Sequence, residues 1–214
     1  MSLAARAIAP GAAPGHDGED RGERLELLES VNASLRRTII RLQGEVATTR
    51  RLAYHDALTG LPNRHLLKDR LDQGAMRASR EGTQVALLLL DLDGFKSVND
   101  EFGHEAGDEL LCEVAERLQR CTRGADTVCR YGGDEFIVML PGVTSAAEAE
   151  HVAQKIRACI DDVPFDIDGR AVRIGISVGL AMLRPGDAAV ERLIRDADRA
   201  MYSAKAAARA MAPR

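Results

Sequence analysis

The chain has 214 residues, of which 45% are hydrophobic and 29% charged, and its formal net charge is −4. This length allows one globular domain and a smaller segment, while the balance of charge offers no general attraction to a nucleic acid polymer or an anionic membrane. With no tryptophan and 3% aromatic residues, the sequence also lacks an evident stacking platform for single-stranded nucleic acid.

No segment stays apolar for the ~20 residues that a membrane helix needs, and residues 1–15 lack the sustained apolar core of a signal peptide. The four cysteines contain no C-x-x-C pair, which favours free thiols in a reducing compartment. We therefore expect a cytoplasmic protein without a membrane span.

Residues 1–22 are rich in Ala, Pro, Gly and charged residues, which predicts a disordered leader. Heptad spacing then predicts a helix over residues 23–52. Its two seven-residue series are Leu25, Asn32, Ile39, Val46 and Ala53, and Leu28, Leu35, Leu42 and Thr49. A polar Asn32 within one series is typical of a parallel two-stranded coiled coil. The pattern favours a homodimer through this helix, although one amphipathic helix packed on its own domain would look similar.

Residues 53–214 are expected to form one domain of alternating helices and strands. The predicted helices are 64–80, 105–122, 145–160 and 190–208. The predicted strands are 84–90, 127–131, 136–140 and a short pair around Asp168-Gly169, whose second member is 172–181. Strand, helix, two strands, helix, strand is the ferredoxin-like order. The sequence therefore predicts an α+β, palm-like domain, with a mainly antiparallel sheet and helices packed on one face.

Two carboxylates follow the apolar run Val85–Leu90, in the sequence Asp91-Leu92-Asp93. A strand that is apolar on both faces is typical of the centre of a sheet, so these acids are expected where that strand ends. Neighbouring carboxylates favour a hard cation such as Mg²⁺. The alternative is that the two acids begin an ordinary turn.

A second acidic motif, Gly132-Gly133-Asp134-Glu135, separates two predicted strands. Adjacent glycines permit positive φ and let a ligand approach the backbone closely. If this hairpin lies beside the strand carrying Asp91, its acids would add oxygen ligands for the same cation. Taken alone, the motif is also an ordinary hairpin turn.

Together, five motifs in order resemble the GGDEF family of diguanylate cyclases. They lie at Asp56–Arg64, Asp91–Asp100, Phe102–Asp108, Gly132–Phe136 and Ala197–Lys205. The resemblance covers residues 53 to 209. It implies a GGDEF domain that uses Mg²⁺, or Mn²⁺ as an alternative, to condense two GTP into cyclic di-GMP and two pyrophosphates across a homodimer.

The resemblance also implies a role for each motif residue. The metal would be held by Asp91, the Leu92 carbonyl, Asp134 and Glu135. The catalytic residues would be Asp134, Glu135 and Lys96, with either Asp134 or a metal-bound water as the general base. Asn99 and Asp108 would read guanine. The other substrate contacts would come from His104, Gly94, Phe95, Gly132, Gly133, Lys205 and Arg209.

The segment Arg123-Gly124-Ala125-Asp126 matches the position of the R-x-x-D product-inhibition site of the family. The resemblance implies that Arg123 and Asp126 bind cyclic di-GMP, although a surface ion pair would read the same. After Lys205 the sequence departs from the family pattern, because the usual Gly-Arg-Asn and final strand are not evident.

Three other functions fit parts of the sequence. The main alternative to an enzyme is a non-catalytic GGDEF module that acts as a cyclic di-GMP-binding effector. A palm-like transferase for another nucleotide and a structural coiled-coil protein are the others. The acids at 91, 134 and 135 argue against the effector, and Asn99 and Asp108 argue against another nucleotide.

Overall fold

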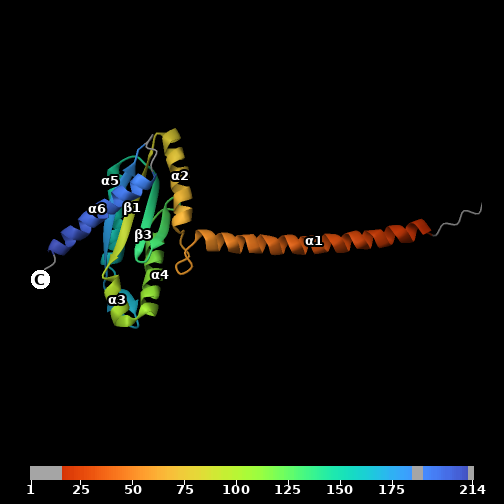
Figure 1. Ribbon diagram of the computed structural model, residues 1–214, viewed down its shortest axis with the longest axis horizontal. Helices are drawn as coiled ribbons and strands as arrows, with labels where there is room; N and C mark the ends of the chain where they lie inside the picture. Colours follow the sequence, from red (N-terminus) through yellow and green to blue (C-terminus); the bar gives the residue numbers. More distant parts are fainter. Residues whose placement is uncertain (1–15, 185–189, 212–214) are drawn as a thin grey trace, which may run out of the picture. The chain divides into compact units, whose positions relative to one another are not determined.

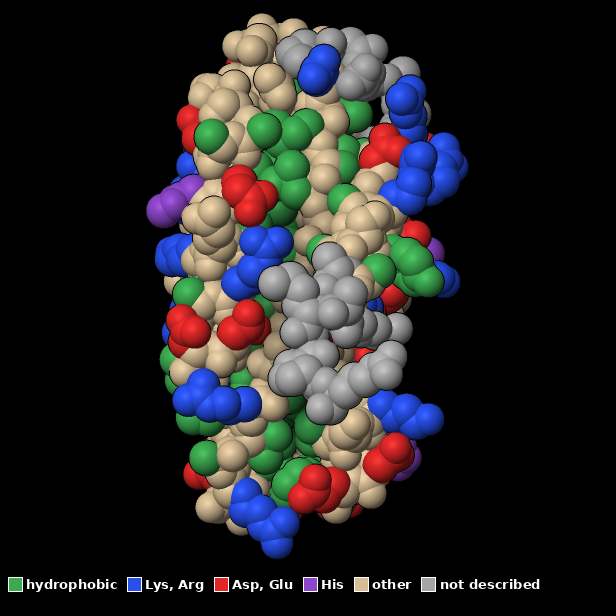
Figure 2. Space-filling view, turned by 90° about the vertical axis from the view of Figure 1, so that its left-hand side faces the viewer, with side chains coloured by type: hydrophobic (Ala, Val, Ile, Leu, Met, Phe, Trp, Pro, Cys, Tyr) green, Lys and Arg blue, Asp and Glu red, His purple; other side chains and the backbone are tan. Residues whose placement is uncertain are grey.

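The computed structural model describes residues 16–184 and 190–211, and the side chains of residues 16–21, 23, 25, 190 and 207–211 are outside this description. The chain divides into two compact units, Met1–Arg50 and Arg51–Arg214. Among the described residues, no helix is long and apolar enough to cross a membrane. On the face drawn in Figure 2, acidic and basic side chains alternate, and its described residues form no extended patch of one sign.

Helix α1 (His16–Tyr54) supplies the described part of the first unit (Figure 1). It begins before the predicted Glu23, so the predicted disordered leader is wrong for residues 16–22. Extending an existing helix adds one hydrogen bond for each residue fixed, which favours this continuation. Large apolar side chains of both heptad series are exposed in this single chain, at 47–59%: Leu28, Leu35, Ile39, Leu42 and Val46.

The second unit is built on a four-stranded antiparallel sheet in the order β2-β3-β1-β6. The strands are β1 (Gln84–Asp93), β2 (Thr127–Gly132), β3 (Glu135–Val143) and β6 (Gly175–Leu183). The helices of this unit are α2 (Arg64–Glu81), α3 (Phe95–Phe102), α4 (His104–Cys121), α5 (Ala146–Asp161) and α6 (Val190–Met211). This order confirms the ferredoxin-like α+β prediction.

The helices cover both faces of the sheet, which corrects the prediction that they pack on one. Successive residues of a strand point to opposite faces, so β1 contributes to two cores. One core joins Leu88 and Leu90 of β1 to α4 and α5. The other joins Leu87 and Leu89 to α2 and α6 (Figure 1). Burial on both faces explains the uninterrupted apolar run of this strand.

Two local elements differ from the predictions. The strand pair expected around Asp168-Gly169 is present as β4 (Phe165–Ile167) and β5 (Arg170–Val172), which form a separate ribbon. Its second member does not run on to residue 181 as predicted, because β5 ends at Val172 and β6 begins only at Gly175. Helix α3 was not predicted. It spans eight residues between Gly94 (φ 87°) and Gly103 (φ 88°), and a run this short offers little periodicity for a sequence pattern to reveal.

Candidate active site

The acids of β1 and of the β2–β3 hairpin meet at one end of the sheet. Asp91 lies opposite Glu135 in the β1–β3 register. The backbone N–H of Leu92 donates to the Asp134 carbonyl at 3.4 Å. The structure therefore brings together the two acidic motifs that the sequence singled out, because β1 and β3 are neighbours in the sheet.

Negative charge accumulates at this sheet end. Burial raises the pKa of Glu135, and the nearby carboxylates of Asp91, Asp134 and Asp198 raise it further. Lys205 on α6 opposes this trend, and its ammonium group forms a short ion pair with Asp91. A cation is therefore favoured here, and in this structure a lysine partly supplies it.

The donor set fits a hard divalent cation only in part. Within the described residues, no three or more His, Cys, Asp or Glu side chains form a complete metal-binding group. Mg²⁺ is commonly held by one or two carboxylates together with substrate phosphates. The half-buried Asp91, Asp134 and Glu135 fit such an incomplete site, which a bound nucleotide would finish.

Helix α6 brings Lys205 to the site because it packs unusually close to β6. A Cβ at Gly179 would lie 2.1 Å from the Ala197 carbonyl oxygen and 2.3 Å from the Met201 amide nitrogen. Only glycine permits this approach. The side chain of Arg209, the other predicted substrate contact on α6, lies outside the described residues.

The predicted guanine-reading residues come from α3 and α4. A Cβ at Gly107 would lie 1.9 Å from Oδ1 of Asn99 and 3.3 Å from the ring of Phe95. The Asn99 amide therefore rests on the bare backbone of α4, directly before Asp108. Asn99 is half-buried and Asp108 is exposed, so one polar group is fixed while the other faces solvent.

The remaining predicted substrate contacts surround the start of α3 and the hairpin tip. Gly94 precedes α3 in the left-handed conformation, and the exposed Lys96 lies in its first turn. The exposed His104 begins α4. Gly132 and Gly133 are both exposed, and Gly133 has φ 52°. Exposed backbone at these points leaves room for a phosphate-bearing ligand.

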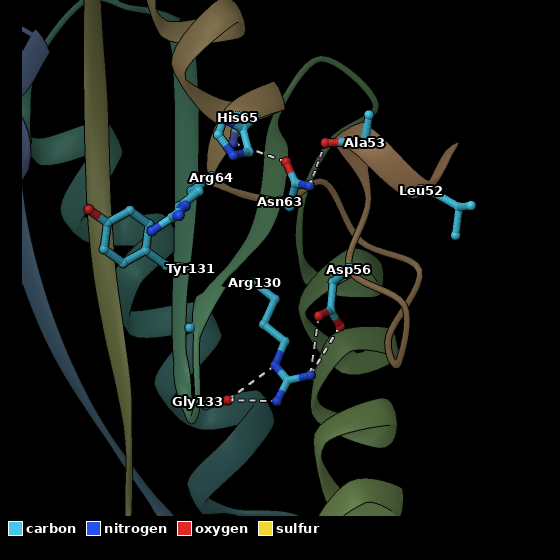
Figure 3. Close-up of a pocket in the computed structure, with 10 residues that line it drawn as sticks. Leu52, Ala53, Asp56, Asn63, Arg64, His65, Arg130, Tyr131 and Gly133 are labelled. Carbon is cyan, nitrogen blue, oxygen red and sulfur yellow. Dashed lines mark hydrogen bonds and ion pairs between the residues drawn. The ribbon is translucent and has the colours of Figure 1, made fainter. Parts of the chain in front are cut away.

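An arginine that the sequence analysis did not assign fixes the hairpin (Figure 3). The Arg130 guanidinium donates to both carboxylate oxygens of Asp56, at 3.1 and 3.3 Å. It also donates to the Gly133 carbonyl, through Nε at 3.1 Å and Nη2 at 2.9 Å. The pair is largely buried, with side-chain exposures of 15% and 23%. Seventy-four positions separate the two residues, so no local pattern reveals the contact.

Burial acts to raise the pKa of Asp56, but hydrogen bonds from Thr59 and Arg130 outweigh it and hold this pKa below its ordinary value. The Asp56–Arg130 pair borders a pocket of about 540 Å³. The other polar and aromatic side chains that line it are Asn63, Arg64, His65 and Tyr131 (Figure 3). Asp56 therefore links the first motif to the hairpin as an anion.

The R-x-x-D segment forms a tight turn at a second pocket, of about 350 Å³. The Asp126 side chain is 1% exposed, and its carboxylate accepts the backbone N–H of Arg123 at 2.8 Å. The Arg123 side chain is 65% exposed and lies 3.4 Å from the same carboxylate. The carboxylate is thus used within the turn, while the guanidinium can reach a ligand.

Known proteins share this domain. Residues 53–211 match the family model described as diguanylate cyclase, GGDEF domain. The chain is 45% identical over 183 residues to the bifunctional diguanylate cyclase/cyclic di-GMP phosphodiesterase MucR of Pseudomonas aeruginosa. It is 39% identical over 194 residues to the diguanylate cyclase DgcP of the same organism. These alignments cover 85% and 91% of this chain but only 25% and 28% of those proteins.

A solved structure also resembles the chain. It is the coiled coil and GGDEF domain of DgcB from Caulobacter crescentus in complex with c-di-GMP, with a TM-score of 0.77 and 30% identity. The match covers 84% of this chain and 95% of that one. The match therefore extends beyond residues 53–211, which the family model covers.

Proposed function

This chain belongs to the GGDEF family of diguanylate cyclases, and on that premise we propose that it condenses two GTP molecules into cyclic di-GMP and two pyrophosphates. The observation that carries the proposal is the pairing of Asp91 with Glu135 at the sheet end, where Lys205 also arrives. Acids for a cation and a lysine for phosphate are thereby brought to one place.

We assign Mg²⁺, with Mn²⁺ as an alternative, to Asp91, the Leu92 carbonyl, Asp134 and Glu135. When bound there, the metal would neutralise phosphate charge and act as a Lewis acid at the reacting phosphorus. The raised pKa of Glu135, caused by burial and by neighbouring acids, supports this assignment because a cation would relieve the same repulsion.

The protein side chains would bind and orient GTP around this point. Asn99 and Asp108 offer an amide and a carboxylate to the guanine edge. Lys96 and Lys205 would meet the triphosphate as point charges, while Gly94 and Phe95 would offer backbone N–H groups. His104 would lie beside the nucleotide, Gly132 and Gly133 would admit it close to the hairpin, and Arg209 would approach its phosphates. The 3′-hydroxyl proton would leave to Asp134 or to water.

Two protomers are needed because one site holds one GTP. Each 3′-hydroxyl would attack the α-phosphorus of the GTP on the other protomer, and holding both substrates in place lowers the barrier. We propose that residues 23–52 of α1 join the protomers as a coiled coil, with residues 53–214 as the catalytic domain. The exposed heptad residues of α1 and the coiled coil in the DgcB structure support this arrangement.

We further propose that Arg123 and Asp126 form a product-inhibition site. The exposed guanidinium at the 350 Å³ pocket would bind a phosphate or guanine of cyclic di-GMP, and the buried Asp126 would hold the turn in shape. With Arg123→Ala, about ten times more added cyclic di-GMP should be needed to halve the rate. Unchanged inhibition would argue for a simple surface ion pair.

A turnover assay tests the function itself. Purified protein is incubated with GTP and Mg²⁺, the nucleotides are separated by chromatography, and Asp134→Ala serves as the control. Cyclic di-GMP from the unmodified protein alone supports the cyclase. If a confirmed dimer, freed of bound product, makes none and yet binds cyclic di-GMP, the effector function replaces the enzyme.

A further inference from the structure

Lys205 lies between two carboxylates of the same strand. Its ammonium nitrogen pairs closely with Oδ1 of Asp91 and lies 3.8 Å from Oδ1 of Asp93. Residues two apart in a strand point to the same face, so both acids face the helix that carries the lysine. The lysine side chain is 24% exposed, which keeps this charge close to its partners.

Asp93 is held in place from the neighbouring strand. Ser177 Oγ lies 3.0 Å from Oδ1 and 2.8 Å from Oδ2 of Asp93. Ser177 itself is 6% exposed on β6, where Gly175 lies directly opposite Asp93. A buried hydroxyl with one partner of this kind orients that partner. Asp93 is thus an anchored acceptor, separate from the acids assigned to the metal.

The ammonium group and a divalent cation compete for Asp91. Two cations cannot share one carboxylate oxygen without strong repulsion. The four-carbon side chain of lysine is flexible, so rotation about its bonds can move the ammonium group to a neighbouring acceptor. Asp93 offers the displaced ammonium a nearby partner, so Lys205 need not become a buried unpaired charge. Without that partner, leaving Asp91 would be much less favourable.

From this geometry we propose that Lys205 is a placeholder cation on Asp91 in the nucleotide-free protein, and that Asp93, positioned by Ser177, receives the lysine when a divalent metal takes Asp91. The inference rests on the metal assignment of the proposed function. It adds that the lysine must leave Asp91 when the metal binds. Metal alone binds weakly because it must displace the lysine. Triphosphate gives the lysine a second acceptor, so nucleotide and metal binding favour each other.

Metal binding without nucleotide tests the proposal. The full chain is titrated with Mn²⁺, and free Mn²⁺ is followed by electron paramagnetic resonance. Lys205→Met should bind Mn²⁺ about tenfold more tightly, because the competing cation is gone. Lys155→Met, at an exposed position on α5, changes the net charge equally and should leave the affinity unchanged. Circular dichroism melting confirms that each variant is folded.

Ser177→Ala isolates the role of Asp93 without changing charge. It should weaken Mn²⁺ binding about threefold in the unmodified protein, because Lys205 then stays on Asp91. In the Lys205→Met background it should have no effect. An equal loss in both backgrounds would overturn the positioning role of Ser177, and equal affinities of Lys205→Met and Lys155→Met, including no binding by either, would overturn the placeholder.

The two proposals fail separately in these experiments. The Mn²⁺ titration does not depend on GTP turnover. If the variants show the predicted Mn²⁺ affinities but the protein makes no cyclic di-GMP, the cyclase is rejected and the competition between Lys205 and the metal is retained. If the protein makes cyclic di-GMP but its Mn²⁺ affinity does not change with Lys205→Met, the cyclase is retained and the competition is rejected.

Discussion

Gly107 shows how a missing side chain shapes the candidate guanine site. The Asn99 amide occupies the space that a Cβ at this position would need, with a separation of only 1.9 Å. Because an amide orients its donors and acceptor as a unit, moving it by even a small distance changes which guanine groups it can meet. In the proposed function, the specificity of the site would thus depend on a residue that need not touch the ligand.

Gly107→Ala should therefore raise KM for GTP by about tenfold, equivalent to about 1.4 kcal/mol, while thermal stability changes little. The alanine gains about 1 kcal/mol in helix propensity, which offsets part of the crowding around Asn99. Steady-state kinetics and a melting curve measure the two effects.

Gly74→Ala is the matched control, since this glycine also lies in a helix. Its added Cβ would crowd the flexible end of Met139 at 2.3 Å and touch Val85 at an ordinary 3.6 Å, away from Asn99. It should leave KM for GTP unchanged. Equal changes in KM for both variants would show that Asn99 is not the cause.

At the scale of elements, the hairpin is fixed by an ion pair rather than by its own turn. Arg130 joins the Gly133 carbonyl to Asp56, which lies in the segment between α1 and α2. Thr59 also donates to Asp56, through N–H at 2.8 Å and Oγ1 at 2.7 Å. The acids of the hairpin tip are thus held by a loop distant in sequence.

Asp56→Asn should lower the free energy of unfolding by about 2 kcal/mol at pH 7, because it leaves the largely buried Arg130 without its anion. The folded pKa of Asp56 lies below its ordinary value of 3.8, so the carboxylate stabilises the fold above that value. This contribution is lost as the pH falls through the lowered pKa.

Urea unfolding between pH 3 and pH 7 would measure the effect at about one-unit steps. The difference between the two proteins should be largest near neutrality and shrink below about pH 4. A difference that stays constant down to pH 3 would show that the charge of Asp56 is not what matters.

Helix α6 depends on close contact with β6. Gly179→Ala would place a Cβ within 2.3 Å of backbone atoms of α6, which cannot move aside as a side chain could. Overpacking of this kind costs about 1–3 kcal/mol, so melting should fall by about 5 °C, and Lys205 should shift from the site. Gly175→Ala in the same strand, whose Cβ would meet Asp93 at an ordinary 3.4 Å, should lower melting much less.

At the scale of the whole molecule, the exposed heptad residues of α1 would determine how protomers meet in the proposed dimer. A helix of 39 residues whose described large apolar side chains are exposed gains little from packing within one chain. Burying those side chains against a second copy would supply the missing stabilisation. It would also raise the local concentration of one catalytic domain around the other.

If the proposed dimer forms through α1, replacing both Leu35 and Leu42 by Glu should convert it to a monomer, because like charges would face each other in the seam. The rate per protomer at micromolar concentration should fall by about tenfold or more and should rise with protein concentration. Light scattering after size exclusion and the turnover assay measure these outcomes. Exchanging two exposed polar positions, Arg36 and Arg37, for Glu should preserve the dimer, and full activity of the monomeric variant would exclude this role for α1.

Much of the fold could be predicted because the determining patterns are local. The apolar run of β1, the helix start after Asn63 and the paired glycines of the hairpin each depend on residues a few positions apart. Helix α3 was not predicted, because it is too short to show a helical pattern. The division between β5 and β6 was not predicted, because a continuous β-prone stretch does not reveal where pairing changes from one sheet to another.

The sequence by itself determined the order of the main strands and helices along the chain, the family and the acids that meet at the sheet end, because alternation, turn residues and motif spacing are properties of neighbouring positions. Only the tertiary structure decided that helices cover both faces, that Arg130 holds the hairpin through Asp56, and that Lys205 lies between the carboxylates of Asp91 and Asp93, the second of which is held by Ser177. Those contacts join residues 74 to 114 positions apart. Electrostatic interactions depend on distance in space, which a linear pattern does not contain.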